Sequence, residues 1–139
     1  MRLAVLDTNV IVSAGIQPDG APAKLIAEWV LGRRVQLVTS PAVVSEYREV
    51  VLRDKFRRYE FPPLWLELAI ELSLWIPEPQ SWPIPCPDPK DAPFLALAHA
   101  SGAWLVTGNL KHFPEDARGG VRILSPADYL GHLAGGAED

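Results

Sequence analysis

The sequence predicts an α/β fold in which helices cover both faces of a parallel sheet. Short apolar runs alternate along the chain with longer segments of helical periodicity, the order from which such layered folds are built. Two runs, 3–6 and 103–107, are apolar almost throughout, as strands covered on both faces tend to be. The 139 residues suffice for one domain with a sizeable core. We therefore expect one domain with right-handed connections between its strands.

Four apolar runs are the candidate strands. They are "LAVL" at 3–6, "VQLVT" at 35–39, "AWLVT" at 103–107 and "VRIL" at 121–124. Segment 76–89 is too rich in proline for a helix or a central strand. We expect it to be extended, with a short edge strand near 75–78, so that the sheet has four or five strands.

Four segments between the strands are candidate helices. They span 22–31, 41–53, 63–75 and 89–101. Ser40 and Asp88 each precede a proline, a combination that favours a helix start, and Gly32 and Gly102 stand where a C-terminal glycine belongs. The helix at 63–75 is apolar beyond one face, and it buries either within the chain or partly against a second subunit.

Composition excludes several classes of protein. A hydrophobic content of 48% with 22% charged residues is too balanced for a disordered chain. No run of about 18 apolar residues and no signal-peptide pattern is found, so we expect a cytoplasmic protein without a membrane segment. A net charge of −4 argues against nucleic-acid binding by overall charge alone. Cys86 is the only cysteine, which excludes an intramolecular disulfide.

Polar residues stand where the candidate strands end. Asp7 follows the first strand, and Thr107, Gly108 and Asn109 end the run at 103–107. In open parallel sheets, ligands bind outside the carboxyl ends of the strands. Asp7 is therefore either part of a ligand site or a turn cap.

Two further acids are placed to join Asp7. Glu46 lies about 100° from the centre of the apolar stripe of its helix, whereas Glu49 lies about 160° away. Asp91 is on the packing side of the helix at 89–101, although with Asp88 it also fits a variant capping box. If the three acids converge, their repulsion raises their pKa values unless a cation is present. Oxygen ligands alone favour Mg²⁺ or Mn²⁺.

Several motifs together resemble one protein family. They are "VLDTNV", "SEYREVVLR", "CPDPKDAPFLALAHASGAWLVTGN" and "ILSPADYL". Over residues 1–131 the chain resembles the PIN-domain family, and within it the VapC-like toxins of bacterial toxin–antitoxin pairs; we expect 132–139 to be a flexible tail. The resemblance implies a Rossmann-like three-layer domain with strand order about 3-2-1-4-5. It further implies a metal-dependent ribonuclease, a homodimer and a small antitoxin partner.

The resemblance also assigns roles to individual residues. Asp7, Glu46 and Asp91 match the family's acids, which are catalytic and bind metal, and Asn109 takes the place of a fourth, commonly an aspartate. Thr107 matches a hydroxyl residue that accompanies it. An amide brings no negative charge and cannot be a general base. A second metal would therefore bind more weakly, and we favour one-metal catalysis.

Other polar residues have supporting or binding roles. Asn9 either orients Asp7 or caps the turn, and Asp88 is more consistent with a helix cap. Lys111 and His112 are close enough to the expected site to bind phosphate. A second basic group could bind single-stranded RNA with help from nearby aromatic rings, or could be a solvated helix end. That group consists of Arg53, Lys55, Arg57 and Arg58.

Three functions compete on these observations. The first is a ribonuclease that hydrolyses RNA to a 3'-hydroxyl and a 5'-phosphate with Mg²⁺ or Mn²⁺. The second is a phosphatase with Asp7 as nucleophile, which needs a second aspartate where Asn9 stands. The third is a non-catalytic PIN-like module that binds RNA or protein, favoured only by the neutral Asn109.

We interpret His99 as structural and expect His132 to be exposed.

Overall fold

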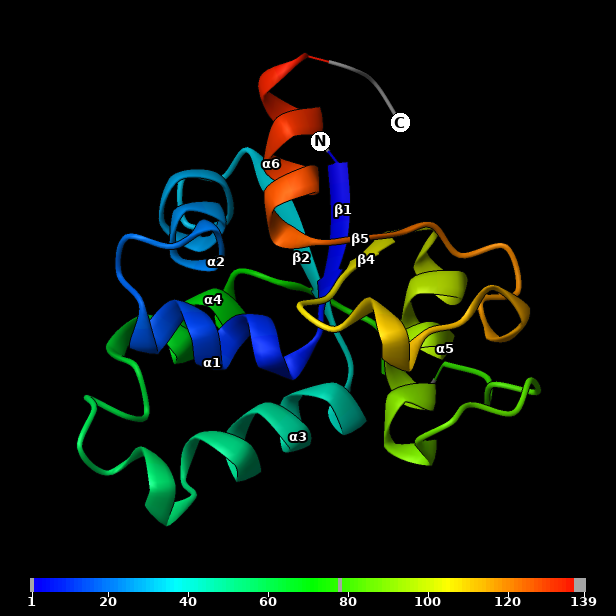
Figure 1. Cartoon of the computed structure of the whole chain (residues 1–139), viewed down its shortest axis with the longest axis horizontal. Coiled ribbons are helices and arrows are strands. Elements are labelled where there is room, and N and C mark those ends of the chain that lie inside the picture. The colour runs from blue at the N-terminus through cyan, green and yellow to red at the C-terminus, as the bar shows by residue number, and fades with distance from the viewer. Residues whose placement is uncertain (1, 78, 137–139) are drawn as a thin grey trace.

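Five parallel strands form one sheet in the order β3-β2-β1-β4-β5 (Figure 1), in a computed structural model that describes residues 2–77 and 79–136. The strands are β1 (Arg2–Leu6), β2 (Val35–Thr39), β3 (Leu74–Trp75), β4 (Trp104–Val106) and β5 (Ile123–Leu124). The predicted fold class and strand order are confirmed.

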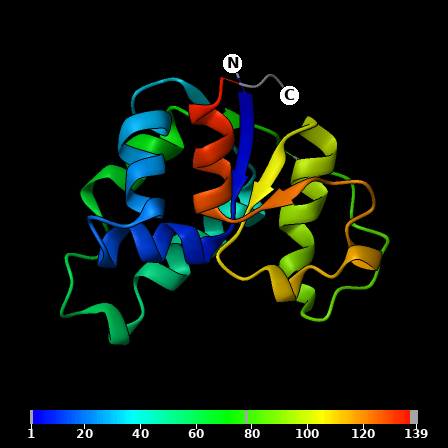
Figure 2. The ribbon, with the colours of Figure 1, turned by 45° about the horizontal axis from the view of Figure 1, so that its top comes forward.

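Helices cover both faces of the sheet. The α-helices are α1 (Thr8–Ile16), α2 (Ala21–Lys24), α3 (Pro41–Val51), α4 (Leu64–Glu71), α5 (Ala92–Ser101) and α6 (Pro126–Ala134). Short helices of other types are η1 (Leu25–Val30), η2 (Asp54–Phe56), η3 (Pro89–Asp91), η4 (Leu110–His112) and η5 (Glu115–Ala117). Helix α5 packs across β1, β2 and β4, while α2 contacts α1 and α6 on the other side of β1 (Figure 2).

The strand order reverses beside β1. The chain moves outward from β1 to β2 and β3, then returns to place β4 and β5 on the other side of β1. Leu6 pairs with Val106, and the next backbone N–H, of Asp7, donates to the carbonyl of Val106 at 2.9 Å. Because β1 and β4 end together, the residues that follow them share the crevice where open α/β sheets bind ligands.

Several predicted boundaries need correction. Helix α1 was not predicted, because its β-branched residues Val10, Ile11 and Val12 favour strands. Helix α4 ends at Glu71 rather than at residue 75, since β3 begins at Leu74. The expected edge strand near 75–78 is thus observed slightly earlier, and residue 78 lies outside the described residues.

The C-terminal helix was not predicted, and it extends into the segment expected to be a tail. Helix α6 continues to Ala134 with Leu133 buried, so the tail expected from residue 132 does not begin there; residues 137–139 lie outside the described part. His132 is half-buried against Trp104, with ring centroids 4.7 Å apart, rather than exposed.

Within residues 2–77 and 79–136, no helix is both long and apolar enough to cross a membrane.

Glycine is required at position 32 for a reason other than the one predicted. Gly102 is left-handed (φ 74°), as expected of a C-terminal glycine, but after η1 the left-handed residue is Arg33 (φ 62°). The π-helical turns of η1 bring the backbone of Glu28 close to Gly32. A Cβ atom at Gly32 would lie 2.2 Å from the carbonyl oxygen of Glu28, so a side chain there forces the backbone to move.

We predict that Gly32→Ala lowers the free energy of unfolding by about 1–3 kcal/mol, the usual cost of overpacking. Gly131→Ala is the matched control, because Gly131 lies in α6 and a Cβ atom added there would meet nothing within 4 Å. It should stabilise the protein by about 0.5–1 kcal/mol through helix propensity. Urea denaturation measures both, and equal effects of the two substitutions would contradict this account of η1.

Candidate active site

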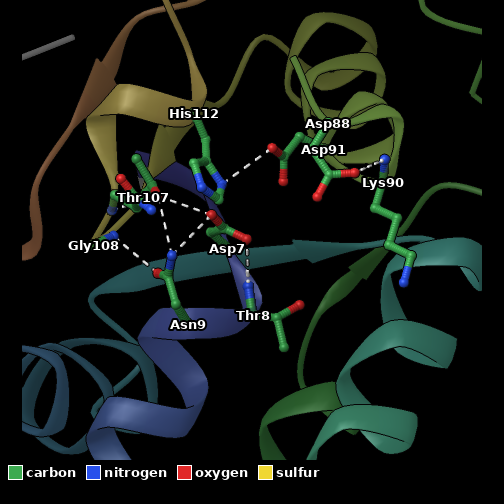
Figure 3. A network of polar contacts seen from close by, with 10 residues as sticks. Asp7, Thr8, Asn9, Asp88, Lys90, Asp91, Thr107, Gly108 and His112 are labelled. Atoms are coloured by element: carbon green, nitrogen blue, oxygen red, sulfur yellow. Dashed lines mark hydrogen bonds and ion pairs between the residues drawn. The ribbon is translucent and has the colours of Figure 1, made fainter. Parts of the chain in front are cut away.

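Asp7 lies at the centre of a polar network at the ends of β1 and β4 (Figure 3). Its Oδ1 accepts a hydrogen bond from the backbone N–H of Thr8 at 2.8 Å, so Asp7 caps α1. Its Oδ2 accepts from Thr107 Oγ1 at 2.8 Å and from Asn9 Nδ2 at 3.2 Å. The same carboxylate therefore caps α1 and belongs to the site, and its neighbours hold it in one orientation.

The residues around Asp7 are also hydrogen-bonded to one another. Thr107 is fully buried and accepts from the backbone N–H of Asn109 at 3.0 Å. Asn9 accepts from the backbone N–H of Gly108 at 2.9 Å and so links α1 to the turn after β4. Asn9 therefore orients Asp7, while the capping role falls to Asp7 itself. Asn109 is joined to this network through its backbone N–H.

Helix α3 presents Glu46 toward this edge. Glu46 is half-buried and Glu49 is exposed, in agreement with the helical periodicity. The next residue, Tyr47, is fully buried, and its hydroxyl donates to the carbonyl of Leu6 at 2.5 Å. This bond fixes α3 to the end of β1, one residue before Asp7. Tyr47 thus positions Glu46, although the sequence pattern identified it only as a core residue.

Asp91 reaches the site from the N-terminal end of α5. It is 7% exposed, and its Oδ2 is buried without a hydrogen-bond partner. His112 Nδ1 lies 3.4 Å from that oxygen (Figure 3), an ion pair only when the imidazole is protonated. Asp88 accepts from the backbone N–H of Lys90 at 3.0 Å and caps the short helix before α5. Asp91 is therefore available to a ligand, whereas Asp88 is engaged as a cap.

The three acids interact electrostatically. Burial raises the pKa of Asp7, and the hydrogen bond from Thr107 offsets part of this. Burial and then the negative charge of Asp7 raise the pKa of Glu46. The same two causes raise the pKa of Asp91 to about 6. Negative charge thus accumulates at this edge, as expected of converging carboxylates.

The donor set fits a hard divalent cation. It consists of carboxylate oxygens, with the buried Oδ2 of Asp91 lacking a hydrogen bond, and Mg²⁺ and Mn²⁺ prefer such ligands. Across 2–77 and 79–136, however, no group of three or more His, Cys, Asp or Glu side chains is close enough to hold a metal ion by itself. Mg²⁺ commonly keeps several water ligands, so such a site need not consist of side chains alone.

The predicted basic residues fall into two groups. Lys111 and His112 lie in η4, directly after the turn that follows β4, and Lys111 is exposed. The group formed by Arg53, Lys55, Arg57 and Arg58 lies beyond the opposite end of α3 (Figure 1), and an eleven-residue helix spans about 16 Å. The structure therefore places η4 beside the acids, whereas in the second group only Arg53 acts on them, its charge lowering the pKa of Glu46.

Lys90 is a further cation near the acids that the sequence pattern did not single out. It is exposed and lies one residue before Asp91, and its positive charge acts to lower the pKa of Glu46. Figure 3 shows its side chain extending from the end of α5 toward α3. In the sequence, Lys90 looks like an ordinary surface residue of the first helical turn, and only the packing of α3 beside α5 reveals that its charge acts on Glu46.

The fold and site define a parallel α/β protein with carboxylates gathered at its strand-order reversal. Residues 3–111 match the family model for the PIN domain. The uncharacterized protein MJ1680 of Methanocaldococcus jannaschii is 32% identical over 108 residues, which are 76% of this chain and 69% of that protein. The chain belongs to the PIN domain family, and the predicted family is confirmed.

Solved structures share the fold. A chain of VapBC2 from Rickettsia felis, solved with a DNA fragment from the VapBC2 promoter, has a TM-score of 0.62 and 17% identity over 88% of this chain and 98% of its own. A chain of FitAcB from Neisseria gonorrhoeae has a TM-score of 0.56 and 22% identity over 89% of this chain and 98% of its own.

We predict that the metal-free protein loses stability as the pH rises from about 5 to about 7.5. A carboxyl whose pKa is higher in the folded chain stabilises the fold at low pH, and this contribution is lost as the pH passes the folded value, about 6 for Asp91. Asp91→Asn removes this loss and should raise Tm at pH 7.5 by a few degrees.

Differential scanning fluorimetry in EDTA measures the effect. Mn²⁺ added at pH 7.5 should raise the Tm of the unmodified protein and change that of Asp91→Asn less, because a bound cation stabilises the state that holds it. An Asp91→Asn variant that melts below the unmodified protein at pH 7.5 in EDTA would contradict the repulsion between the acids.

Proposed function

We propose that this protein is a divalent-metal-dependent endoribonuclease. The observation that carries the proposal is the gathering of Asp7, Glu46 and Asp91 at the shared end of β1 and β4, where the pKa values of all three are raised. Membership of the PIN domain family supports the same function. The proposed reaction is hydrolysis of an RNA phosphodiester bond to a 3'-hydroxyl and a 5'-phosphate.

Each residue of the site has a separate part in this proposal. Asp7 is the central ligand, because Thr107 and Asn9 hold its carboxylate in place. Glu46 and Asp91 complete the ligand set from two helices. The chemistry supplied by a bound Mg²⁺ or Mn²⁺ is Lewis acidity at the phosphate and a lowered pKa of water.

The RNA itself is bound by cations next to the acids. Lys111 and His112 in η4 bind phosphates of the RNA, and Lys90 faces the RNA from the other side of the acids. The amide oxygen of Asn109 positions a ligand or water without adding charge, which favours a single metal ion. The basic group Arg53, Lys55, Arg57 and Arg58 then binds a more distant part of a long RNA through its charge.

We predict that Glu46→Gln lowers metal-dependent RNA cleavage by about two to three orders of magnitude, as loss of a group that stabilises transition-state charge typically does. Glu49→Gln is the matched control, since Glu49 lies in the same helix but is exposed and away from the site. Its activity should equal that of the unmodified protein. Single-stranded and structured RNAs with Mg²⁺, Mn²⁺ or EDTA provide the assay.

Three outcomes would reject the nuclease. Equal cleavage by the protein and by Asp7→Asn would indicate a contaminating enzyme. Binding of RNA with no cleavage in either metal would favour a non-catalytic binding module, an interpretation supported by the absence of a closed ligand cluster within the described residues. Release of phosphate from a small phosphomonoester without RNA cleavage would favour a phosphatase, although Asn9 is engaged with Asp7 and Gly108.

We further propose protein partners in the cytoplasm, namely a small antitoxin and a second copy of the chain. Helix α4 and β3 expose Leu64 (93%), Leu68 (49%) and Trp75 (48%), an unusual set for an isolated surface. These residues are the proposed contact between two copies, in line with the apolar character of segment 63–75.

Leu64→Lys should therefore convert a dimer, of twice the 15.3 kDa chain mass, into a monomer with nearly unchanged Tm. Leu110→Lys is the control, because Leu110 is also exposed (40%) but lies in η4. Sedimentation equilibrium measures the masses. A protein that is monomeric at all concentrations, or a Leu64→Lys variant that remains dimeric, would contradict this contact.

A further inference from the structure

A pocket of about 480 Å³ lies beside the carboxylates without including them. Its walls come from the N-terminal ends of α3 and α5 and from the proline-rich connection before η3. The volume is that of a small-molecule site, within the usual range of about 300–1,000 Å³. The pocket is therefore large enough for one flat ring system, and it is too small for a helix or for a second copy of the chain.

The walls of the pocket are mostly apolar. Rings of Pro41, Pro77 and Pro93 line it together with the indole of Trp82. Trp82 is held in place, since its Nε1 donates to the carbonyl of Ala117 at 3.1 Å. It also packs on Gly119, where an added Cβ would lie 2.7 Å from the indole. The indole is thus held in one position where it lines the pocket, which lowers the entropic cost of binding a ring against it.

The lining of the pocket includes residues that are neighbours in the chain of two of the acids. Pro41 begins the helix that carries Glu46, and Pro89 and Ala92, which also line the pocket, are close neighbours of Asp91 in the chain. Lys90 stands between Pro89 and Asp91 and acts on Glu46. Lys90 and the lining residues Pro89 and Ala92 are therefore all within two positions of Asp91 in the chain.

We propose that this pocket takes one unpaired nucleobase of the RNA, next to the phosphate that is cleaved. The inference rests on the proposed ribonuclease function and narrows its substrate to RNA that is single-stranded at this point. Stacking on an aromatic ring is tolerant of sequence because every base has a π-face, and Ser81 in the lining adds a hydroxyl for the edge of the base. A paired base cannot enter, since it is stacked and hydrogen-bonded within a duplex.

The test fills the pocket without disturbing the acids. Ala42 lines the pocket and is exposed, so Ala42→Leu occupies its space at little risk to folding. Ala127→Leu is a closely matched control, because Ser125, Pro126 and Ala127 begin α6 as Ser40, Pro41 and Ala42 begin α3. Both substitutions place leucine at the second position of a helix, and only one lies in the pocket.

Cleavage is measured on an RNA oligonucleotide whose cut site has been mapped, and on versions with one abasic position on either side of the cut. Ala42→Leu should reduce kcat/KM on the intact RNA by about tenfold, the effect of losing one stacked base. On the RNA that lacks the base bound in the pocket, Ala42→Leu and the unmodified protein should cleave equally. Ala127→Leu should match the unmodified protein on every RNA.

Binding is measured separately by fluorescence anisotropy with homopolymeric RNA oligonucleotides on the Asp7→Asn protein. Adding Ala42→Leu to Asp7→Asn should weaken binding by about the same tenfold factor. Unchanged binding and cleavage, or an equal loss on intact and abasic RNA, overturns the proposal that the pocket binds a nucleobase. Release of a copurifying protein by Ala42→Leu, with RNA binding unchanged, also overturns it and indicates that the pocket binds a side chain of a partner protein. Failure of the unmodified protein to cleave any RNA rejects the ribonuclease instead, and the anisotropy measurement then still decides the pocket.

Discussion

The hydrogen bond from Thr107 Oγ1 to Asp7 Oδ2, at 2.8 Å, joins residues that are 100 positions apart in the chain. It forms because β1 and β4 are neighbours in the sheet and end at the same level. With Asn9 on the same oxygen, it fixes the orientation of the Asp7 carboxylate at the strand-order reversal. Glu46 and Asp91 form a ligand site only in combination with this fixed carboxylate.

The same arrangement lowers the stability of the fold through electrostatic repulsion. Burial and mutual repulsion raise the pKa values of the acids, and Asp91 keeps a buried oxygen without a hydrogen bond. A divalent cation would relieve both, since it offsets the repulsion and accepts oxygen donors. The hydrogen bond of Tyr47 to Leu6 keeps α3 in place despite this repulsion. The fold thus gives up some stability at a site poised to bind a cation, as is common at functional sites.

Much of the fold and part of the site could be predicted from the sequence. Continuous apolar runs identified the buried strands, and helical periodicity placed Glu46 beside the buried face. Helix α1 could not be predicted in this way, because Val10, Ile11 and Val12 have the same β-branched character as a strand. The pairing of His112 with Asp91, the positioning role of Tyr47 and the approach of Lys90 to Glu46 depend on contacts between distant elements, which local patterns do not encode.

The most direct test of the metal site is a crystal structure of the protein grown with Mn²⁺, with anomalous scattering recorded to locate the ion. We expect one strong anomalous peak in contact with Asp7 and Asp91, with Glu46 bound directly or through water and Asn109 nearby without a second ion of equal occupancy. A map with no peak at this edge, or with its peak away from all three carboxylates, would rule out the proposed metal site.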